Sequence, residues 1–201
     1  MIRLLLAEDQ GMVRGALAAL LELEDDLEVV AQVARGDEIV DAVLEHRPDV
    51  ALLDIELPGL DGIAAAAEVR RRAAQTRVLM LTTFGRPGYL RRAMEAGASG
   101  FLVKDGPADE LAAAIRRVVG GERIVDPALA ASALTAGENP LTGRERDVLR
   151  AARHGATVTA IANELHLSEG TVRNYLSSSI GKTDAANRIE AARRADDLGW
   201  L

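Results

Sequence analysis

Four short apolar runs in the first 105 residues each end directly before a polar side chain, and they constrain the fold more than any other feature. They are Leu4–Ala7, Val50–Leu53, Val78–Leu81 and Phe101–Val103. Near-continuous apolar runs indicate strands that are buried on both faces of a parallel sheet. With a further strand expected at 27–33 and helical segments between the strands, the pattern predicts a doubly wound α/β domain of five parallel strands.

The expected boundaries follow from these runs and from residues that start or stop helices. Asp61 is a good N-cap for the third helix, Pro107 suits the first turn of the fifth, and Gly120-Gly121 ends the fifth. Strands are expected at 3–8, 27–33, 49–54, 77–82 and 99–103, and helices at 10–23, 36–46, 62–74, 86–96 and 107–119.

Polar side chains should gather at one edge of such a sheet, because the carboxyl ends of parallel strands meet there. The residues that follow the apolar runs are Glu8 and Asp9, Asp54, Thr82 and Lys104. Three carboxylates that lie this close cannot all stay charged without a cation. Since the ligands would all be oxygens, Mg²⁺ is the expected metal.

Residues 1–125 resemble the receiver domain of response regulators. The matching segments, in the order of that family, are Glu8-Asp9, Asp54–Gly59, Leu81-Thr82, Gly100-Phe101 and Lys104-Asp105. The resemblance implies a flavodoxin-like fold and phosphorylation of Asp54 by a partner histidine kinase. It also implies that Mg²⁺ is held by Glu8, Asp9, Asp54 and the backbone carbonyl of Glu56.

The resemblance assigns further roles in the same site. Lys104 would pair with one phosphoryl oxygen, and Thr82 would donate a hydrogen bond to another. Phe101 lies three residues before Lys104, where it is either a rotating aromatic switch residue coupled to Thr82 or a core residue. Glu8 stands where the family more usually has Asp, and Glu56 adds a negative charge beside the site.

Other functions fit these residues less well. Turn capping by scattered polar residues would explain any one position but not the full ordered set. A phosphatase that used Asp54 as its nucleophile would need a second Asp where Glu56 stands. The histidines, His46, His154 and His166, are dispersed, and no P-loop pattern occurs. We therefore expect a phosphoryl acceptor that slowly hydrolyses its own phosphoryl group, and not an enzyme with an external substrate.

The charge is divided unevenly along the chain, which indicates two domains with different partners. The formal net charge of −7 lies entirely in residues 1–137, since residues 138–201 carry nine basic and nine acidic side chains. A receiver domain is expected at 1–121, a linker with a short helix at 122–140, and a helical domain at 141–201. The chain has no Cys, no apolar run of membrane-spanning length and no signal-peptide pattern, so a cytoplasmic location is expected.

Residues 141–201 have the pattern of an all-α domain of four helices. Thr142 and Glu145 form a capping box at the start of the first helix. A second helix around Ile161 is followed by a tight turn, after which Ser168 caps a third helix. A short turn between two such helices is typical of a helix-turn-helix.

This region resembles the LuxR-type DNA-binding domain of the NarL/FixJ class. The matching motifs are Leu141–Glu145, Ile161-Ala162, Leu167-Ser168, Thr171–Tyr175 and Asn187-Arg188. The resemblance implies that the third helix binds double-stranded promoter DNA through Thr171, Arg173, Asn174, Ser177 and Lys182. Arg173 could bind guanine and Asn174 adenine, whereas Thr171 and Lys182 are better placed for phosphates.

The apolar spacing of this helix and the net charge of the region bear on the expected DNA binding. Val172, Leu176 and Ile180 follow helical spacing and are expected to face the core. Because the region carries no net charge, a phosphorylation-dependent protein-binding adaptor remains the alternative function. If the domain does bind DNA, its weak electrostatic attraction makes the affinity depend on dimerisation.

Three stretches, residues 82–89, residues 170–176 and Gly199-Trp200, are similar to a DesR-like subgroup of the family. That similarity implies a DesK-like histidine kinase as phosphoryl donor and membrane-lipid genes as targets. The first helix carries one charge, Arg14, and more apolar residues than one core stripe needs. We therefore expect a homodimer on phosphorylation, formed through the first and fifth helices. The expected interface residues are Val13, Leu17, Leu111, Ala112 and Ile115.

Overall fold

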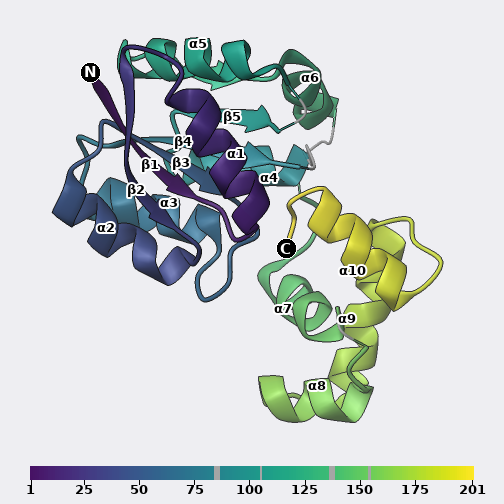
Figure 1. Cartoon of the computed structure of the whole chain (residues 1–201). Coiled ribbons are helices and arrows are strands. Elements are labelled where there is room, and N and C mark those ends of the chain that lie inside the picture. The colour runs from purple at the N-terminus through teal and green to yellow at the C-terminus, as the bar shows by residue number, and fades with distance from the viewer. Residues whose placement is uncertain (84–86, 105, 136–138, 154) are drawn as a thin grey trace. The chain divides into compact units, whose positions relative to one another are not determined.

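The structure is a computed structural model that describes residues 1–83, 87–104, 106–135, 139–153 and 155–201 (Figure 1). The chain divides into two compact units. The first unit covers Met1–Gly85 and Leu90–Ala130, and the second covers Arg86–Tyr89 and Ala131–Leu201. Two residues named from the sequence, Asp105 and His154, lie outside the described part of the chain, as do residues 84–86 of the stretch 82–89 and residues 136–138 of the expected linker.

The first unit is built on a parallel sheet with the strand order β2-β1-β3-β4-β5-β6. The strands are β1 (Ile2–Ala7), β2 (Leu27–Val33), β3 (Val50–Asp54), β4 (Arg77–Thr82), β5 (Gly100–Val103) and β6 (Ile124–Val125). Every neighbouring pair is parallel, which confirms the predicted doubly wound fold. The two-residue β6 adds a sixth strand within the expected linker, where Ile124 pairs with Gly100.

Helices cover both faces of this sheet. They are α1 (Gly11–Leu21), α2 (Ile39–His46), α3 (Gly62–Arg72) and α5 (Ala108–Val119). The chain also forms α4 (Pro87–Glu95) between β4 and β5, and α6 (Pro127–Thr135) after β6. Helices α1 and α5 pack against each other on one face, and α2 packs against α3 on the other (Figure 1). The segment expected as one helix at 36–46 begins with a 3-10 turn, Gly36–Glu38, and becomes α-helical at Ile39.

The central strands are buried on both faces, as their continuous apolar sequence predicts. All five residues of β3 are buried, and so are the last four of β1. Leu and Ala fill much of this core, where Leu4, Leu52 and Leu79 have no exposed surface. Removing this apolar area from water stabilises the unit and leaves the polar residues only at the strand ends.

The turn from β3 into α3 is closed by Gly62. Its N–H donates to the carbonyl of Ile55 over 2.9 Å. A Cβ at this position would lie 1.8 Å from the carbonyl oxygen of Asp54. The side chain of Asp61 then caps α3 by accepting from the N–H of Ala64 at 2.8 Å. This tight turn fixes the backbone from which the Asp54 side chain projects.

The second unit contains four packed helices, α7 (Gly143–Ala152), α8 (Val158–Leu165), α9 (Glu169–Lys182) and α10 (Arg188–Asp197). The predicted capping box of Thr142 and Glu145 is present, and Ser168 caps α9 through the N–H of Thr171. The core is built around Val148, Leu149, Ile161 and Val172 with the small residues of α10. Among the described residues, no helix is both long and apolar enough to span a membrane.

Candidate functional site

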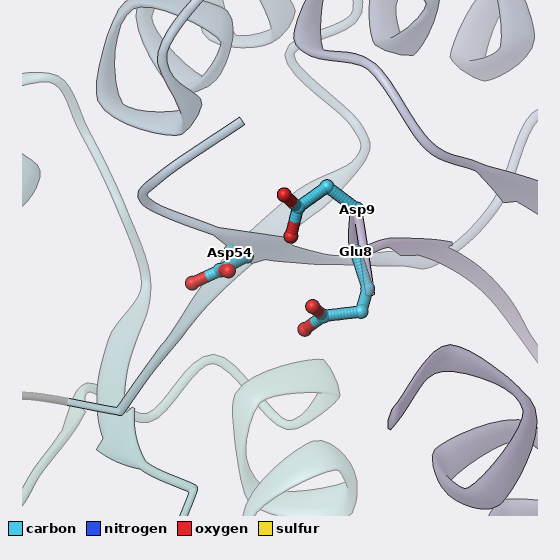
Figure 2. A group of neighbouring side chains, drawn as sticks. All are labelled: Glu8, Asp9 and Asp54. Carbon is cyan, nitrogen blue, oxygen red and sulfur yellow. The ribbon is translucent and has the colours of Figure 1, made fainter. Parts of the chain in front are cut away.

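Three carboxylates meet at the carboxyl edge of the sheet. Glu8 and Asp9 directly follow β1, and Asp54 is the last residue of the neighbouring strand β3. Figure 2 shows the three side chains turned toward a common space. One oxygen from each lies within 4.8 Å of the others. Glu8 has no exposed surface and Asp54 is 7% exposed, whereas Asp9 is exposed, so two carboxylates of the group are removed from water and the third faces it.

Lys104 provides a cation inside this group. Its Nζ contacts Glu8 Oε2 and lies 3.0 Å from Asp54 Oδ2. The backbone N–H of Lys104 donates to the carbonyl of Thr82 over 2.8 Å, which ties the ends of β4 and β5 together. One ammonium cannot balance three ionised carboxylates, so the site retains excess negative charge and can attract a further cation.

Backbone N–H groups orient two of the carboxylates, and one arginine binds the backbone beside them. The N–H of Gln10 donates to Glu8 Oε1 at 3.1 Å, and the N–H of Ile55 donates to Asp54 Oδ1 at 2.8 Å. Arg14 on α1 donates from Nη1 to the carbonyl of Glu8 at 2.5 Å. The start of α1 is therefore fastened to the loop that carries Glu8 and Asp9. Sequence reasoning noted Arg14 only as the single charge of this helix.

A hollow of about 240 Å³ opens beside the carboxylates. It is lined by Asp9, Gln10, Asp54, Glu56, Thr82 and Thr83. Four of the residues expected at the site thus line one space, and Lys104 adjoins it through Asp54. Carboxylate oxygens beside open space suit a hard divalent cation such as Mg²⁺, which keeps several of its water ligands.

Phe101 lies on β5 with no exposed surface. It pairs with Met80 of β4 and Val125 of β6. A core position is therefore established for this ring. A rotating switch role coupled to Thr82 stays a prediction.

Helix α9 presents two different sides. Val172 and Leu176 are buried in the helical core, as predicted, and Ile180 packs partly against it. Arg173, Asn174 and Ser177 are exposed, whereas Thr171 is half-buried and its hydroxyl shares a hydrogen bond with Ser168. The exposed polar side chains are thus available to a partner along the outward side of the helix.

Arg173 and Lys182, the two cationic residues predicted to contact DNA, are ion-paired within the unit. Arg173 donates to Glu169 over 2.6 Å, one helical turn earlier. Lys182 lies 2.7 Å from Oε2 of Glu145 on α7. The Glu–Arg spacing of four residues was visible in the sequence, but the contact between residues 145 and 182 had no sequence signal.

Glu145 joins α7 to α9 from a buried position. It is 3% exposed and accepts from the N–H of Thr142, the hydroxyl of Ser178 and the ammonium of Lys182. Burial alone would raise the pKa of this carboxyl, but the hydrogen bonds from Lys182, Ser178 and Thr142 outweigh it and lower the pKa to about 2. Glu145 is therefore ionised throughout the ordinary pH range.

The residues expected at a dimer interface are not all on the surface. Val13, Leu17 and Leu111 are half-buried. Ala112 and Ile115 are buried in the receiver core, with 1% and 0% exposure, so their expected part in an exposed patch is wrong. They occupy the stripe of α5 that faces the sheet, which periodicity alone did not separate from the outer stripe.

Comparison with known proteins places this architecture in a family. Residues 4–116, more than half of the chain, match the response regulator receiver domain. The chain belongs to the response regulators. Residues 139–195 of this response regulator match the bacterial regulatory proteins of the luxR family, so it joins a receiver domain to a LuxR-type DNA-binding domain.

Relatives of this response regulator align along its whole length. It is 49% identical over 201 residues to the transcriptional regulatory protein YvfU of Bacillus subtilis strain 168, with all of both chains covered. It is 47% identical over 201 residues to the transcriptional regulatory protein DesR of the same organism, again with full coverage of both.

Solved structures share its fold. The response regulator ChrA of a heme-sensing two-component system is 31% identical, with a TM-score of 0.60 and coverage of 100% of this chain and 98% of ChrA. A structure of RcsB dimers bound to DNA has a TM-score of 0.71 at 21% identity and covers 98% of each chain, a likeness of fold.

Proposed function

We propose that this response regulator accepts a phosphoryl group on Asp54 from a DesK-like histidine kinase, dimerises, and then binds promoter DNA through α9. The proposed domains are the receiver at 1–121, a linker with a short helix at 122–140 and the DNA-binding domain at 141–201. The observation that supports the phosphoryl site most strongly is the ammonium of Lys104, 3.0 Å from Asp54 Oδ2 and beside the group formed by Glu8, Asp9 and Asp54.

In the proposed reaction, an oxygen of Asp54 attacks the phosphorus of the donor as the bond from phosphorus to the donor breaks. A carboxylate is a weak nucleophile, so the site must neutralise charge on the phosphoryl oxygens. Lys104 pairs with one such oxygen and Thr82 donates to another. The oxygens of Glu8, Asp9, Asp54 and the Glu56 carbonyl would hold Mg²⁺, which supplies further charge neutralisation when it is bound.

The test of the phosphoryl site is a mass measurement after incubation with acetyl phosphate and Mg²⁺. We expect one added phosphoryl group in the wild type and none in Asp54→Ala. The matched control is Asp41→Ala, since Asp41 is an exposed carboxylate on α2 that is not part of the cluster. Equal labelling of the Asp54→Ala protein would show that another residue is the acceptor.

We propose that Thr82 and Phe101 carry the change of state from the phosphoryl group to the outer surface. Dimerisation then uses α1 and α5, with Val13, Leu17 and Leu111 as the remaining candidates for the interface. Self-hydrolysis of the phosphoryl group returns the protein to its starting state. The 47% identity to the transcriptional regulatory protein DesR supports a role in transcription. Membrane-lipid genes are the targets we propose.

Base contacts are proposed for Arg173 and Asn174, and phosphate contacts for Thr171 and Lys182. Ser177 is proposed to contact DNA beside them. Arg173→Ala and Asn174→Ala should each lower specific binding by about 1–3 kcal/mol while non-specific binding changes little. Lys182→Ala should weaken binding to all sequences alike. Binding would be measured on DNA selected by the wild type and on a scrambled duplex of equal length.

A protein-binding adaptor is the second candidate, and one observation favours it. Arg173 and Lys182 are both ion-paired within the unit, and residues 138–201 carry no net charge, so the electrostatic attraction to DNA is weak. If the phosphorylated wild type selects no sequence from a random duplex pool, DNA reading is excluded and the adaptor function takes its place.

A further inference from the structure

The side chain of Glu169 connects α8 to the outward side of α9. Thr159 on α8 donates its hydroxyl to Glu169 Oε1 at 2.6 Å. Arg173 donates from Nη2 to Glu169 Oε2 at 2.6 Å. Each carboxylate oxygen therefore has one partner, and the two partners come from different helices.

We propose that Glu169 is a positioning residue that holds the guanidinium of Arg173 in the orientation required to read one base pair, and that Glu169 thereby sets how strongly the protein discriminates between sequences. The inference rests on the proposed reading of DNA by α9. It assigns Glu169 no contact with DNA and makes it act only through Arg173.

The need for positioning follows from the exposure of Arg173. Its side chain is 62% exposed, and a long side chain with this freedom loses rotamer entropy when it is fixed on a base. The guanidinium has five N–H donors in a planar fork. When Glu169 engages one Nη2 donor, other N–H groups stay available to the two acceptors of a guanine. The plane of the guanidinium is then already oriented before DNA binds.

Glu169 is itself held from two directions. It is the first residue of α9, where the positive end of the helix dipole stabilises a carboxylate. The hydrogen bond from Thr159 and then that from Arg173 lower the pKa of its carboxyl, so it is charged at neutral pH. Because Thr159 belongs to another helix, the orientation of Glu169 is fixed relative to the turn between α8 and α9.

Two other roles for the Glu169–Arg173 pair give different outcomes. A pair that only supports the helix would leave the ratio of specific to non-specific binding unchanged. A pair that withholds Arg173 from DNA would make the loss of Glu169 strengthen specific binding. Positioning alone predicts that discrimination falls.

The experiment uses the full-length phosphorylated protein and two duplexes, one selected by the wild type from a random pool and one scrambled. For Glu169→Gln we expect the ratio of specific to non-specific affinity to fall by about three- to tenfold, part of the value of one bidentate base contact. Thr159→Val, which keeps the shape and removes the hydroxyl, should lower the ratio in the same direction by less. Glu164→Gln removes the same charge from an exposed position on α8 and should leave the ratio unchanged.

The decisive measurement is the Glu169→Gln change in an Arg173→Ala background. If Glu169 acts through Arg173, it should alter the ratio no further there. An equal fall in both backgrounds, an unchanged ratio in the wild-type background, or tighter specific binding by Glu169→Gln would each overturn the inference and leave DNA reading intact. Failure of the wild type to select any sequence would overturn the proposed function and this inference together. Far-ultraviolet circular dichroism of each variant checks that the fold is unchanged.

Discussion

Gly62 lies closer to the Asp54 backbone than any side chain would allow. The Cβ of an alanine would lie 1.8 Å from the carbonyl oxygen of Asp54, a backbone atom that cannot turn away as a side chain can. The turn between β3 and α3 must therefore open for any other residue, and Asp54 must move with it.

We predict that Gly62→Ala destabilises the receiver unit by about 1–3 kcal/mol, as overpacking does, and lowers phosphorylation of Asp54. Urea unfolding followed by circular dichroism and mass measurement after acetyl phosphate treatment check the two effects. The control is Gly15→Ala within α1, where a Cβ meets nothing within 4 Å. That change should be neutral or stabilising by up to about 1 kcal/mol. Equal stability of the two variants would contradict the prediction.

Glu145 is the residue whose charge most clearly contributes to the stability of the helical unit. Its pKa falls from an ordinary 4.5 to about 2 in the folded protein. A carboxyl with a lower folded pKa stabilises the fold at pH values above its unfolded pKa. This stabilisation is lost as the pH falls from about 4.5 toward 2.

We predict that Glu145→Gln costs about 3 kcal/mol of unfolding free energy at pH 7 and flattens the pH dependence of stability between pH 4.5 and 2. The amide keeps the size of the side chain but removes the charge that Lys182 faces. Denaturant unfolding of both proteins at pH 7 and pH 3 measures the two effects. A difference between wild type and variant that is the same at both pH values would contradict this role of the charge.

At the scale of elements, α1 has an outward apolar row next to the half-buried Val13 and Leu17. The row is Met12, Ala16 and Leu20, all exposed, with Met12 at 91% and Leu20 at 44%. Four-residue spacing places the three side chains one above the other on the helix. Leu17 packs against the receiver core, so changing it would confuse folding with association.

We predict that Met12→Asp lowers dimerisation of the phosphorylated protein at least tenfold without loss of stability, because a charge would be buried at the two-fold contact. Sedimentation velocity measures the monomer–dimer equilibrium. Ala67→Asp, at an exposed position on α3, is the matched control and should dimerise as the wild type does. A full-strength dimer of phosphorylated Met12→Asp would remove α1 from the proposed interface.

The strands were predictable from the sequence because burial on both faces removes polar alternation. Each of the five expected strands lies within one residue of its predicted ends. The 3-10 turn at Gly36–Glu38 was not predicted from the local pattern, and the segment it lies against is distant in sequence: a Cβ on Gly36 would lie 1.7 Å from the carbonyl oxygen of Leu60. The two residues of β6 are too few to form a pattern.

Some contacts of the site residues were likewise predictable from the sequence, and others were not. The meeting of Glu8, Asp9 and Asp54 was predictable, because the chain direction of parallel strands fixes which ends share an edge. The contacts of Glu145 with Lys182 and of Thr159 with Glu169 depend on how helices pack, which the sequence pattern of each helix does not specify.

At the scale of the whole molecule, the two parts of the chain differ in net charge as well as in fold. The −7 formal charge lies in residues 1–137, which hold the sheet and its acidic site, and residues 138–201 are neutral. A neutral helical unit has little long-range attraction to a phosphate backbone. Joining two copies therefore matters more for its DNA affinity than it would for a basic domain.

The chain contains one tryptophan, Trp200. It is 8% exposed, packs in the helical core, and its Nε1 has no hydrogen-bond partner among the described residues. Tryptophan emission should therefore start at short wavelength and shift to the red only when the helical unit opens. Unfolding of the sheet should leave the tryptophan emission unchanged, but it changes the circular dichroism. Melting of one unlabelled sample, followed by both signals, then distinguishes the opening of the helical unit from the unfolding of the receiver unit.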